Sequence, residues 1–252
     1  LAHLVGAALG SGEVAVLEAP VGDGARDPVD ELTDAPLAPA LAGAALFRFG
    51  CYAVMTALAL WAERRPAPSL PDVGIALIPY VPWVDRLNYV AWLLLYTPLT
   101  VLLLVSEPRR WVRYMVTGGL ISLARGLCIA VTGLGPPDPV QAAGLAAHVP
   151  YWQGLVELLS PVDVFARGAA RTYLTKDLFF SGHTATTFLV VLYLWHRPRL
   201  RWVALAAHVV VVGTVLVSHL HYTIDILGAY AVTFAIFALR EWQPRTGSGG
   251  HV

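Results

Sequence analysis

Two short segments in the second half of the chain contain residue types that phosphate transfer requires. Residues 181–184 are Ser-Gly-His-Thr, and residues 221–225, about 40 positions later, are His-Tyr-Thr-Ile-Asp. Each segment stands at the start of a long apolar stretch. Imidazoles can act as nucleophiles or as general acids and bases, and a neighbouring carboxylate can orient them. The two segments together therefore indicate a candidate catalytic site.

The first segment has the features of a helix start that binds an anion. Ser181 is a favoured residue immediately before a helix, and Gly182 allows another group to come close to the backbone. The unpaired N–H groups and the positive end of such a helix attract a phosphate. We therefore expect Ser181 and Gly182 to contact phosphate, with His183 beside it. The structural alternative is a capped helix start that carries an interfacial histidine.

The second segment pairs an imidazole with a carboxylate. His221 and Asp225 are four residues apart, so they share one face of a helix. A carboxylate in that position fixes the tautomer of the imidazole and stabilises its cation. The structural alternative is a hydrogen-bonded pair that anchors a helix end. Ionisable groups are costly inside a membrane, so the occurrence of both segments in one membrane protein favours a catalytic function.

The composition places the chain among helical membrane proteins. Of 252 residues, 57% are hydrophobic and only 13% are charged, whereas a soluble domain carries about 25% charged residues. Mean hydropathy is +0.62. The formal net charge is zero, which gives no indication of a nucleic-acid partner. The two cysteines, Cys51 and Cys128, fall in apolar stretches, so we expect core residues and neither a disulfide, a metal site nor a cofactor.

We predict an all-α, six-helix transmembrane bundle. A spanning helix needs about 20 mainly apolar residues, and an acidic tail (1–39) and a short tail (243–252) would flank a membrane domain at 40–242. A proline-rich loop (66–82) and a long connection (134–179), part of which is expected to lie at the interface, interrupt that domain. The six predicted spans are 41–61, 87–105, 111–133, 180–195, 202–218 and 222–240.

Six spans place both chain ends on one side of the membrane, together with the connections at 106–110 and 196–201. Arginines cluster near the helix ends on this side, so the positive-inside rule favours a cytoplasmic assignment for it. The two histidine segments, the loop at 66–86 and the connection at 134–179 fall on the opposite side. We therefore expect the active site on the non-cytoplasmic face. The clustered arginines are Arg109, Arg110, Arg197, Arg199, Arg201, Arg240 and Arg245.

Four stretches of the sequence resemble one known family. Residues 176–184 (KDLFFSGHT) and 218–226 (SHLHYTIDI) are similar to the two signature motifs of the sphingomyelin synthase family. That family is a branch of the type-2 phosphatidic acid phosphatase superfamily. Residues 68–72 (PSLPD), followed by Ile78-Pro79, resemble its first conserved block, and residues 125–137 resemble its second. The first two matches are the more specific.

This resemblance implies a membrane enzyme whose partners are lipids. Such an enzyme moves a phospho-head-group, for example phosphocholine or phosphoethanolamine, from a glycerophospholipid to ceramide or a related lipid alcohol. By matching position, His221 would be the nucleophile at phosphorus, Asp225 its orienting partner and His183 the general acid and base. The resemblance does not indicate which head group, acceptor or oligomeric state to expect.

Two departures distinguish this chain from the plain lipid phosphatases of the superfamily. Those enzymes carry a lysine followed, after six residues, by Arg-Pro. In this chain no Arg-Pro follows Lys176. They also place an arginine six residues before the nucleophilic histidine, where this chain has Val215. Both departures weaken the first alternative, a lipid phosphate phosphatase that uses water as acceptor. The intact histidines and aspartate weaken the second, a non-catalytic lipid-binding membrane protein.

Other groups must then hold the phosphate. Arg125 lies about 21 Å along its predicted helix from Trp111, in the half nearest the motifs, and a guanidinium suits phosphate oxygens. It could equally pair with a helix-end carbonyl or a carboxylate. Asp177 either hydrogen-bonds a catalytic histidine or caps the fourth helix, and Tyr222, next to the proposed nucleophile, is assigned to substrate contacts.

The remaining histidines and aromatic residues have less specific interpretations. His208, in the middle of the fifth predicted span, is expected to be a satisfied core histidine, while His219 could be structural or functional. Five aromatic residues near the motif side could cage a quaternary ammonium, but an interfacial aromatic belt is the simpler interpretation. These aromatic residues are Tyr80, Trp83, Tyr151, Trp152 and Tyr173.

Overall fold

The computed structural model describes residues 36–137, 150–166 and 173–241, and these form helices and loops without a strand. The all-α prediction is therefore confirmed for this part of the chain. Most of the two predicted tails lies outside the described residues. The long helices are α2 (Leu37–Glu63), α4 (Pro82–Ser106), α5 (Pro108–Val131), α11 (Leu200–Val217) and α12 (Thr223–Glu241), and the shorter ones are α3 (Val73–Leu77), α7 (Tyr151–Leu159), α8 (Pro161–Ala166) and α10 (Gly182–Leu194).

Each of the six predicted spans corresponds to one helix, but one of these helices is shorter than a membrane span. In the described part of the chain, five helices are long and apolar enough to cross a membrane, and α10 has only 13 residues. At 1.5 Å per residue α10 is about 20 Å long, against about 30 Å of hydrocarbon. The chain is thus a multi-pass membrane protein. The length of α10 alone does not support the sixth predicted crossing.

The short α10 occupies the centre of the bundle. It packs against α4, α5, α11 and α12. Its buried side chains Leu189, Val190 and Tyr193 form part of the main hydrophobic core. On the outside, large apolar side chains such as Leu46 and Leu239 remain exposed, as expected of surfaces that face lipid.

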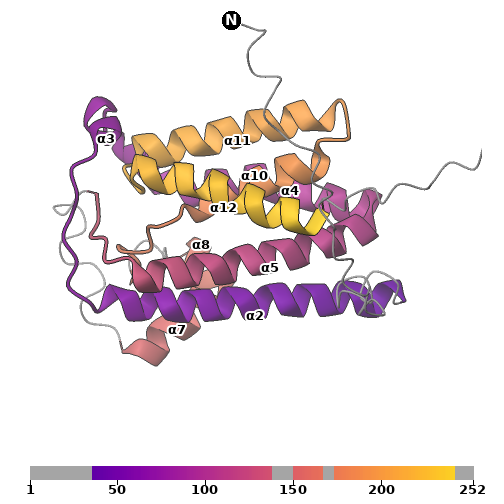
Figure 1. The fold of residues 1–252 in the computed structure, drawn as a ribbon, viewed down its shortest axis with the longest axis horizontal. Helices are drawn as coiled ribbons and strands as arrows, with labels where there is room; N and C mark the ends of the chain where they lie inside the picture. Colours follow the sequence, from indigo (N-terminus) through magenta and orange to yellow (C-terminus); the bar gives the residue numbers. More distant parts are fainter. Residues whose placement is uncertain (1–35, 138–149, 167–172, 242–252) are drawn as a thin grey trace, which may run out of the picture.

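The longest packed pair is α2 and α5, which lie side by side along most of their length (Figure 1). Their backbones come very close at Gly126, where an added Cβ would lie 2.9 Å from the Cα of Met55. The same pairing runs from Ala62 beside Ile129 at one end to Ala44 beside Val112 at the other. The two helices therefore run parallel and fix each other in register.

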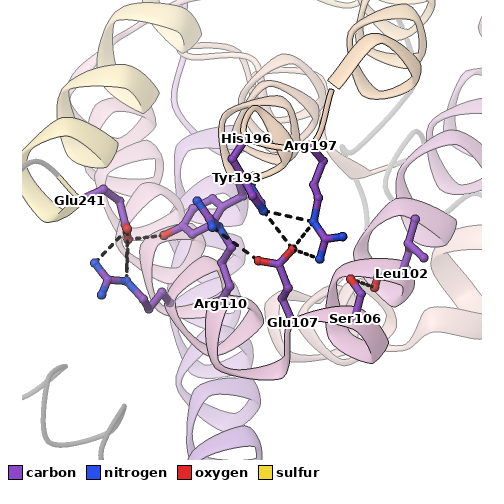
Figure 2. A network of polar contacts seen from close by, with 9 residues as sticks. Leu102, Ser106, Glu107, Arg110, Tyr193, His196, Arg197 and Glu241 are labelled. Carbon is purple, nitrogen blue, oxygen red and sulfur yellow. Dashed lines mark hydrogen bonds and ion pairs between the residues drawn. The ribbon is translucent and has the colours of Figure 1, made fainter. Parts of the chain in front are cut away.

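One end of the bundle is closed by two carboxylates. Glu107, between α4 and α5, accepts hydrogen bonds from His196 (3.0 Å) and Arg197 (2.7 Å) after the end of α10 (Figure 2). Glu241 at the end of α12 accepts a hydrogen bond from Tyr193 (2.7 Å) and pairs with Arg113 (2.9 Å). Burial raises the pKa of Glu107, but the hydrogen bonds from Arg197 and His196 outweigh it and hold the pKa below its ordinary value.

The opposite end, on the left in Figure 1, gathers the four stretches that resemble the conserved blocks. The backbone N–H of Ser181 donates to the carbonyl of Asp225 (3.1 Å). The hydroxyl of Tyr222 donates to the carbonyl of Gly135 (2.8 Å) and accepts from the N–H of Leu70 (3.0 Å). Segments far apart in sequence thus meet at one end of the bundle, as the alternation of helix directions predicts.

The predicted proline-rich loop contains one short helix that the sequence analysis did not anticipate. Asp72 accepts a hydrogen bond from the N–H of Ile75 (3.1 Å) and so caps α3. The same carboxylate accepts from the N–H of Thr223 (2.6 Å) and from its hydroxyl (2.9 Å) at the start of α12. Asp72 therefore fixes the loop directly against the helix that carries Asp225.

Candidate active site

His221 lies two residues before α12 and Asp225 lies in its first turn, so the two do not share a helical face as predicted, but both are buried. The Nδ1 atom of His221 is 3.3 Å from Oδ2 of Asp225. That oxygen also accepts a hydrogen bond from the backbone N–H of Tyr222 at 2.9 Å. A separation of 3.3 Å is long for a charge-assisted hydrogen bond, and such contacts often shorten when substrate binds. Because Nδ1 faces the carboxylate, Nε2 is the nitrogen left for chemistry.

His183 stands in the first turn of α10 between two aromatic side chains of α4. Its ring lies edge-on to Tyr89, with ring centroids 4.9 Å apart, and to Trp92 at 5.4 Å. Its Nε2 atom is buried and has no hydrogen-bond partner among the described residues. A buried polar atom without a partner is unusual in proteins. The aromatic rings therefore hold the imidazole in place and leave one nitrogen available to a ligand.

One cavity of about 370 Å³ joins the two histidines. It lies between α2, α4, α5, α10 and the pair α7 and α8, and His183, His221, Arg125 and Asp177 all line it. Its remaining walls are mostly apolar and aromatic, as in pockets that bind apolar ligands. The aromatic lining residues are Phe49, Tyr52, Tyr89, Trp92 and Tyr96.

Arg125 lies at the predicted depth on α5, but its guanidinium is largely engaged by the chain itself. Nε donates to the carbonyl of Phe180 (2.6 Å) and Nη2 to the carbonyl of Asp177 (3.0 Å). Nη1 is 2.8 Å from Oδ1 of Asp177, close enough for an ion pair although the angles are not those of a hydrogen bond. The alternative of pairing with helix-end carbonyls and a carboxylate is thus observed. Arg125 positions the segment that leads into α10.

Gly182 and Ser181 also serve this positioning. A Cβ at Gly182 would lie 3.2 Å from Cζ and Nε of Arg125, so the glycine makes room for the guanidinium. The hydroxyl of Ser181 accepts from the N–H of Thr184 (3.4 Å) and from its hydroxyl (3.1 Å). The predicted helix cap is therefore present, while a direct contact of either residue with phosphate stays a prediction.

Tyr222, assigned from sequence to substrate contacts, is not among the described residues that line the cavity. Its buried hydroxyl connects Leu70 and Gly135 instead. Asp72, which the sequence analysis did not single out, supports the same helix start. Burial raises the pKa of Asp72, but hydrogen bonds from Thr223 and Ile75 outweigh it and lower the pKa below its ordinary value. The first turn of α12 is thus held by the ionised Asp72 and by Tyr222.

Lys176 has a structural role at the edge of the site. Its Nζ donates to the carbonyls of Glu63 (2.8 Å) and Arg65 (2.6 Å), at the end of α2. The carboxylate of Glu63 accepts from the backbone N–H groups of Thr175 (2.9 Å) and Lys176 (2.8 Å). Val215, where the superfamily phosphatases carry arginine, is fully buried. Neither position supplies a cation to the cavity.

The interpretation of His208 as a satisfied core histidine is confirmed. Its Nδ1 is 2.7 Å from the hydroxyl of Thr187, and its Nε2 is 2.8 Å from that of Tyr230. His219 turns its Nε2 towards the carbonyl of Ile78 at 2.8 Å, which is a structural contact between two loops.

None of the five aromatic residues proposed from sequence for a cage is among the described residues that line the cavity, and two of them form hydrogen bonds elsewhere in the chain. The hydroxyl of Tyr151 donates to the carbonyl of Ala57 (3.0 Å), and that of Tyr173 to the carboxylate of Glu157 (2.5 Å). The aromatic residues of the cavity come from inside the predicted spans. On α4 the positions 89, 92 and 96 follow the spacing of one helical face, and this was the signal that could have found them.

Several known proteins are similar to this chain in sequence. Residues 176–242 match the family described as PAP2 superfamily C-terminal. The chain is 27% identical over 186 residues to human sphingomyelin synthase-related protein 1, covering 69% of this chain and 44% of the relative. The resemblance to the sphingomyelin synthase family is confirmed.

Two further relatives have names that state a reaction. A phosphatidylcholine:ceramide cholinephosphotransferase of Caenorhabditis elegans is 27% identical over 189 residues, covering 69% of this chain and 40% of the relative. A phosphatidylethanolamine:ceramide ethanolaminephosphotransferase of Trypanosoma brucei brucei is 29% identical over 136 residues, covering 50% of this chain and 39% of the relative. The chain thus spans less than half the length of each of these three relatives.

Proposed function

We propose that this protein is a lipid phosphotransferase that moves a phospho-head-group from a glycerophospholipid to ceramide or a related lipid alcohol. The observation that carries the proposal is the single cavity lined by both His183 and His221, with Asp225 behind the latter. The mostly apolar walls suit lipid chains. The names of the relatives, which include transfer of choline phosphate and ethanolamine phosphate to ceramide, support the same reaction class.

In the proposed first step, Nε2 of His221 attacks phosphorus. A nitrogen–phosphorus bond forms, the bond from phosphorus to the diacylglycerol oxygen breaks, and His183 gives its proton to that oxygen. Asp225 accepts the N–H of Nδ1 and so stabilises the positive charge that develops on the imidazole. The result is a phosphohistidine and a free diacylglycerol.

In the proposed second step, His183, now neutral, takes the proton of the acceptor hydroxyl. The acceptor oxygen bonds to phosphorus and the nitrogen–phosphorus bond breaks, which restores both histidines. Donor and acceptor can then use the same cavity in turn. In this scheme Arg125, Asp177, Ser181 and Gly182 shape the phosphate site at the start of α10, and Tyr222 holds the start of α12. No metal or cofactor takes part in these steps.

The phosphatase alternative has less support. The two positions that would supply its additional cations hold Lys176, which bonds to backbone carbonyls, and Val215, which is buried. Water could still complete the second step slowly, so hydrolysis is expected as a minor side reaction. A purely lipid-binding function would leave the unpartnered Nε2 of His183 unexplained.

The reaction can be tested with purified protein in liposomes that contain ceramide and a mixture of phosphatidylcholine and phosphatidylethanolamine. We expect mass spectrometry to detect a ceramide phospho-head-group product together with an equal amount of diacylglycerol. The matched control is the His221→Asn variant in the same liposomes. Release of a free water-soluble head-group phosphate without any ceramide product would instead support the phosphatase alternative.

We also propose that α10 completes six crossings and that the site faces the non-cytoplasmic side. The direction of the helices alternates, and the arginines after α4 and α10 lie at the end of the bundle opposite the histidines. Among these, Arg110 and Arg197 both contact Glu107. The short α10 would cross with the help of the loop segment before it, which Arg125 holds inside the bundle.

Cysteine labelling tests this topology. In a background with Cys51 and Cys128 replaced by alanine, we expect Ala76→Cys, which is exposed in α3, to react with a membrane-impermeant reagent from the non-cytoplasmic side only. The matched variant Ser106→Cys, exposed at the other end, should react only after the cytoplasmic side is opened. Reaction of both cysteines from the same side would contradict the proposed arrangement.

A further inference from the structure

A second arginine lines the same cavity and has no counterpart in the chemistry described above. Arg48 is near the middle of α2, and its Nη1 donates to the hydroxyl of Ser122 on α5 at 3.0 Å. Both residues line the cavity with the two histidines. In the described part of the chain, Arg48 forms no ion pair with a carboxylate, whereas Arg125 pairs with Asp177.

An arginine in this position carries a free-energy cost in the membrane. A charged side chain near the centre of a membrane helix opposes insertion of that helix into the bilayer. A single neutral hydroxyl offsets little of that cost. Such residues usually face a cavity through which a ligand passes or in which it binds. The position is also built for the guanidinium, because a Cβ at Gly118 would lie only 2.9 Å from Nη1 of Arg48.

The depth of this guanidinium can be estimated along α5. Ser122, its partner, comes three residues before Arg125, which corresponds to about 4.5 Å along the helix axis. Since α5 runs towards the end of the bundle that holds the histidines, Ser122 lies deeper in the apolar region than Arg125. The guanidinium of Arg48 therefore lies about one helical turn below the proposed phosphate site.

A donor lipid has a particular group at that depth. In a diacyl glycerophospholipid, the ester carbonyls lie only a few bonds from the phosphorus, where the glycerol joins the acyl chains. With phosphorus at His221 and the chains directed into the apolar cavity, a carbonyl oxygen falls roughly one helical turn, about 5 Å, below the phosphate. A carbonyl oxygen is an acceptor without charge, and Arg48 has further N–H groups besides the one used by Ser122.

We propose that Arg48, oriented by Ser122, forms a subsite that binds an ester carbonyl of the donor lipid and so selects acyl-linked over ether-linked donors. This inference rests on the proposed function, because it takes the phosphorus to be bound at His221. It assigns Arg48 to specificity and not to the chemical steps. The cost of placing this charge within a membrane helix is then offset when the donor binds.

The test compares two phosphatidylcholines with the same chain length, one with ester and one with ether linkages. A hydrogen bond to a charged group corresponds to about tenfold or more in affinity. We expect the wild type to prefer the ester donor by about tenfold in kcat/KM, and Arg48→Met to bring the ratio to within twofold of one. Ser122→Ala should give an intermediate ratio. Arg110→Met, which removes an arginine at the other end of the bundle, should leave the wild-type ratio unchanged.

A purely structural role of Arg48 would lower the activity with both donors equally and would leave the ratio intact, which would overturn the inference. A wild-type ratio near one would overturn it as well. If no donor is turned over, the proposed function fails separately. In that case native mass spectrometry of the purified protein with both lipids tests the subsite. Preferential retention of the ester lipid by the wild type, with loss of that preference in Arg48→Met, supports the subsite. Equal retention of the two lipids by the wild type rejects it.

Discussion

Replacing His221 with asparagine is expected to reduce head-group transfer by at least about a thousandfold, because an amide cannot replace the proposed nucleophile. The protein should remain folded. The N–H of Tyr222 still satisfies Oδ2 of Asp225 in the variant, and the side chain of asparagine fits within the volume of the imidazole. The rate is measured as ceramide product formed per protein in liposomes. Thermal unfolding of the purified variant serves as the check on folding.

The covalent intermediate gives this prediction a second readout. With a donor labelled at phosphorus and the acceptor omitted, we expect the wild type to retain a label that survives alkali and is lost in acid, while His221→Asn retains none. The matched control is His196→Asn, which removes a histidine that contacts Glu107 at the other end of the bundle. That variant should label like the wild type. A wild type that never labels, and whose double-reciprocal plots intersect, would show that the acceptor attacks the donor directly.

The sequence correctly predicted that the side chains of His221 and Asp225 meet, although the two residues do not share one helix as expected. The helix α12 begins at Thr223, so His221 precedes it, and the two side chains meet where the chain enters the helix, at Tyr222, whose N–H donates to Oδ2 of Asp225. Likewise, alternating helix directions suffice to place the starts of α10 and α12 at one end of the bundle. The bond between Ser181 and Asp225 is a consequence of that alternation and of short loops.

The roles of the residues around the histidines could not be predicted in the same way. Arg125 and Gly182 were expected to touch phosphate, but they touch each other, and Arg125 also binds the backbone of Phe180. Such contacts depend on how a loop returns across α5. A sequence shows that a guanidinium is present at a certain depth, but it does not show whether backbone carbonyls reach it before a ligand does.

The length of α10 illustrates a further limit. Hydropathy continues from Phe180 to Trp195, so the apolar run alone suggests a longer helix than Gly182–Leu194. The helix begins late because Ser181 caps it and because Asp177 and Phe180 give their carbonyls to Arg125. A polar side chain from a neighbouring helix thus takes the bonds that another helical turn would have used. Arg48 is one charge within a predicted span, and the sequence does not reveal its surroundings, since its cavity forms between helices.

Replacing His183 with alanine is expected to reduce transfer by about a hundredfold or more, the usual range for a general acid or base. In the proposed mechanism His183 protonates the departing diacylglycerol, whose alkoxide is otherwise a poor leaving group. The observation behind this assignment is that Nε2 of His183 has no partner among the described residues and that His183 lines the shared cavity. The loss should appear mainly in kcat, because the aromatic walls at Tyr89 and Trp92 remain to bind lipid.

A change of leaving group separates this role from simple damage to the site. The p-nitrophenyl ester of phosphocholine releases a stable phenolate that needs no proton, so His183→Ala should form the His221 adduct from this donor at nearly the wild-type rate. Transfer of the adduct to ceramide should stay slow in the same variant, because the acceptor hydroxyl still lacks its base. An equal loss of adduct formation with the natural donor and with the nitrophenyl ester would mean that His183 holds the site together and does not move the proton.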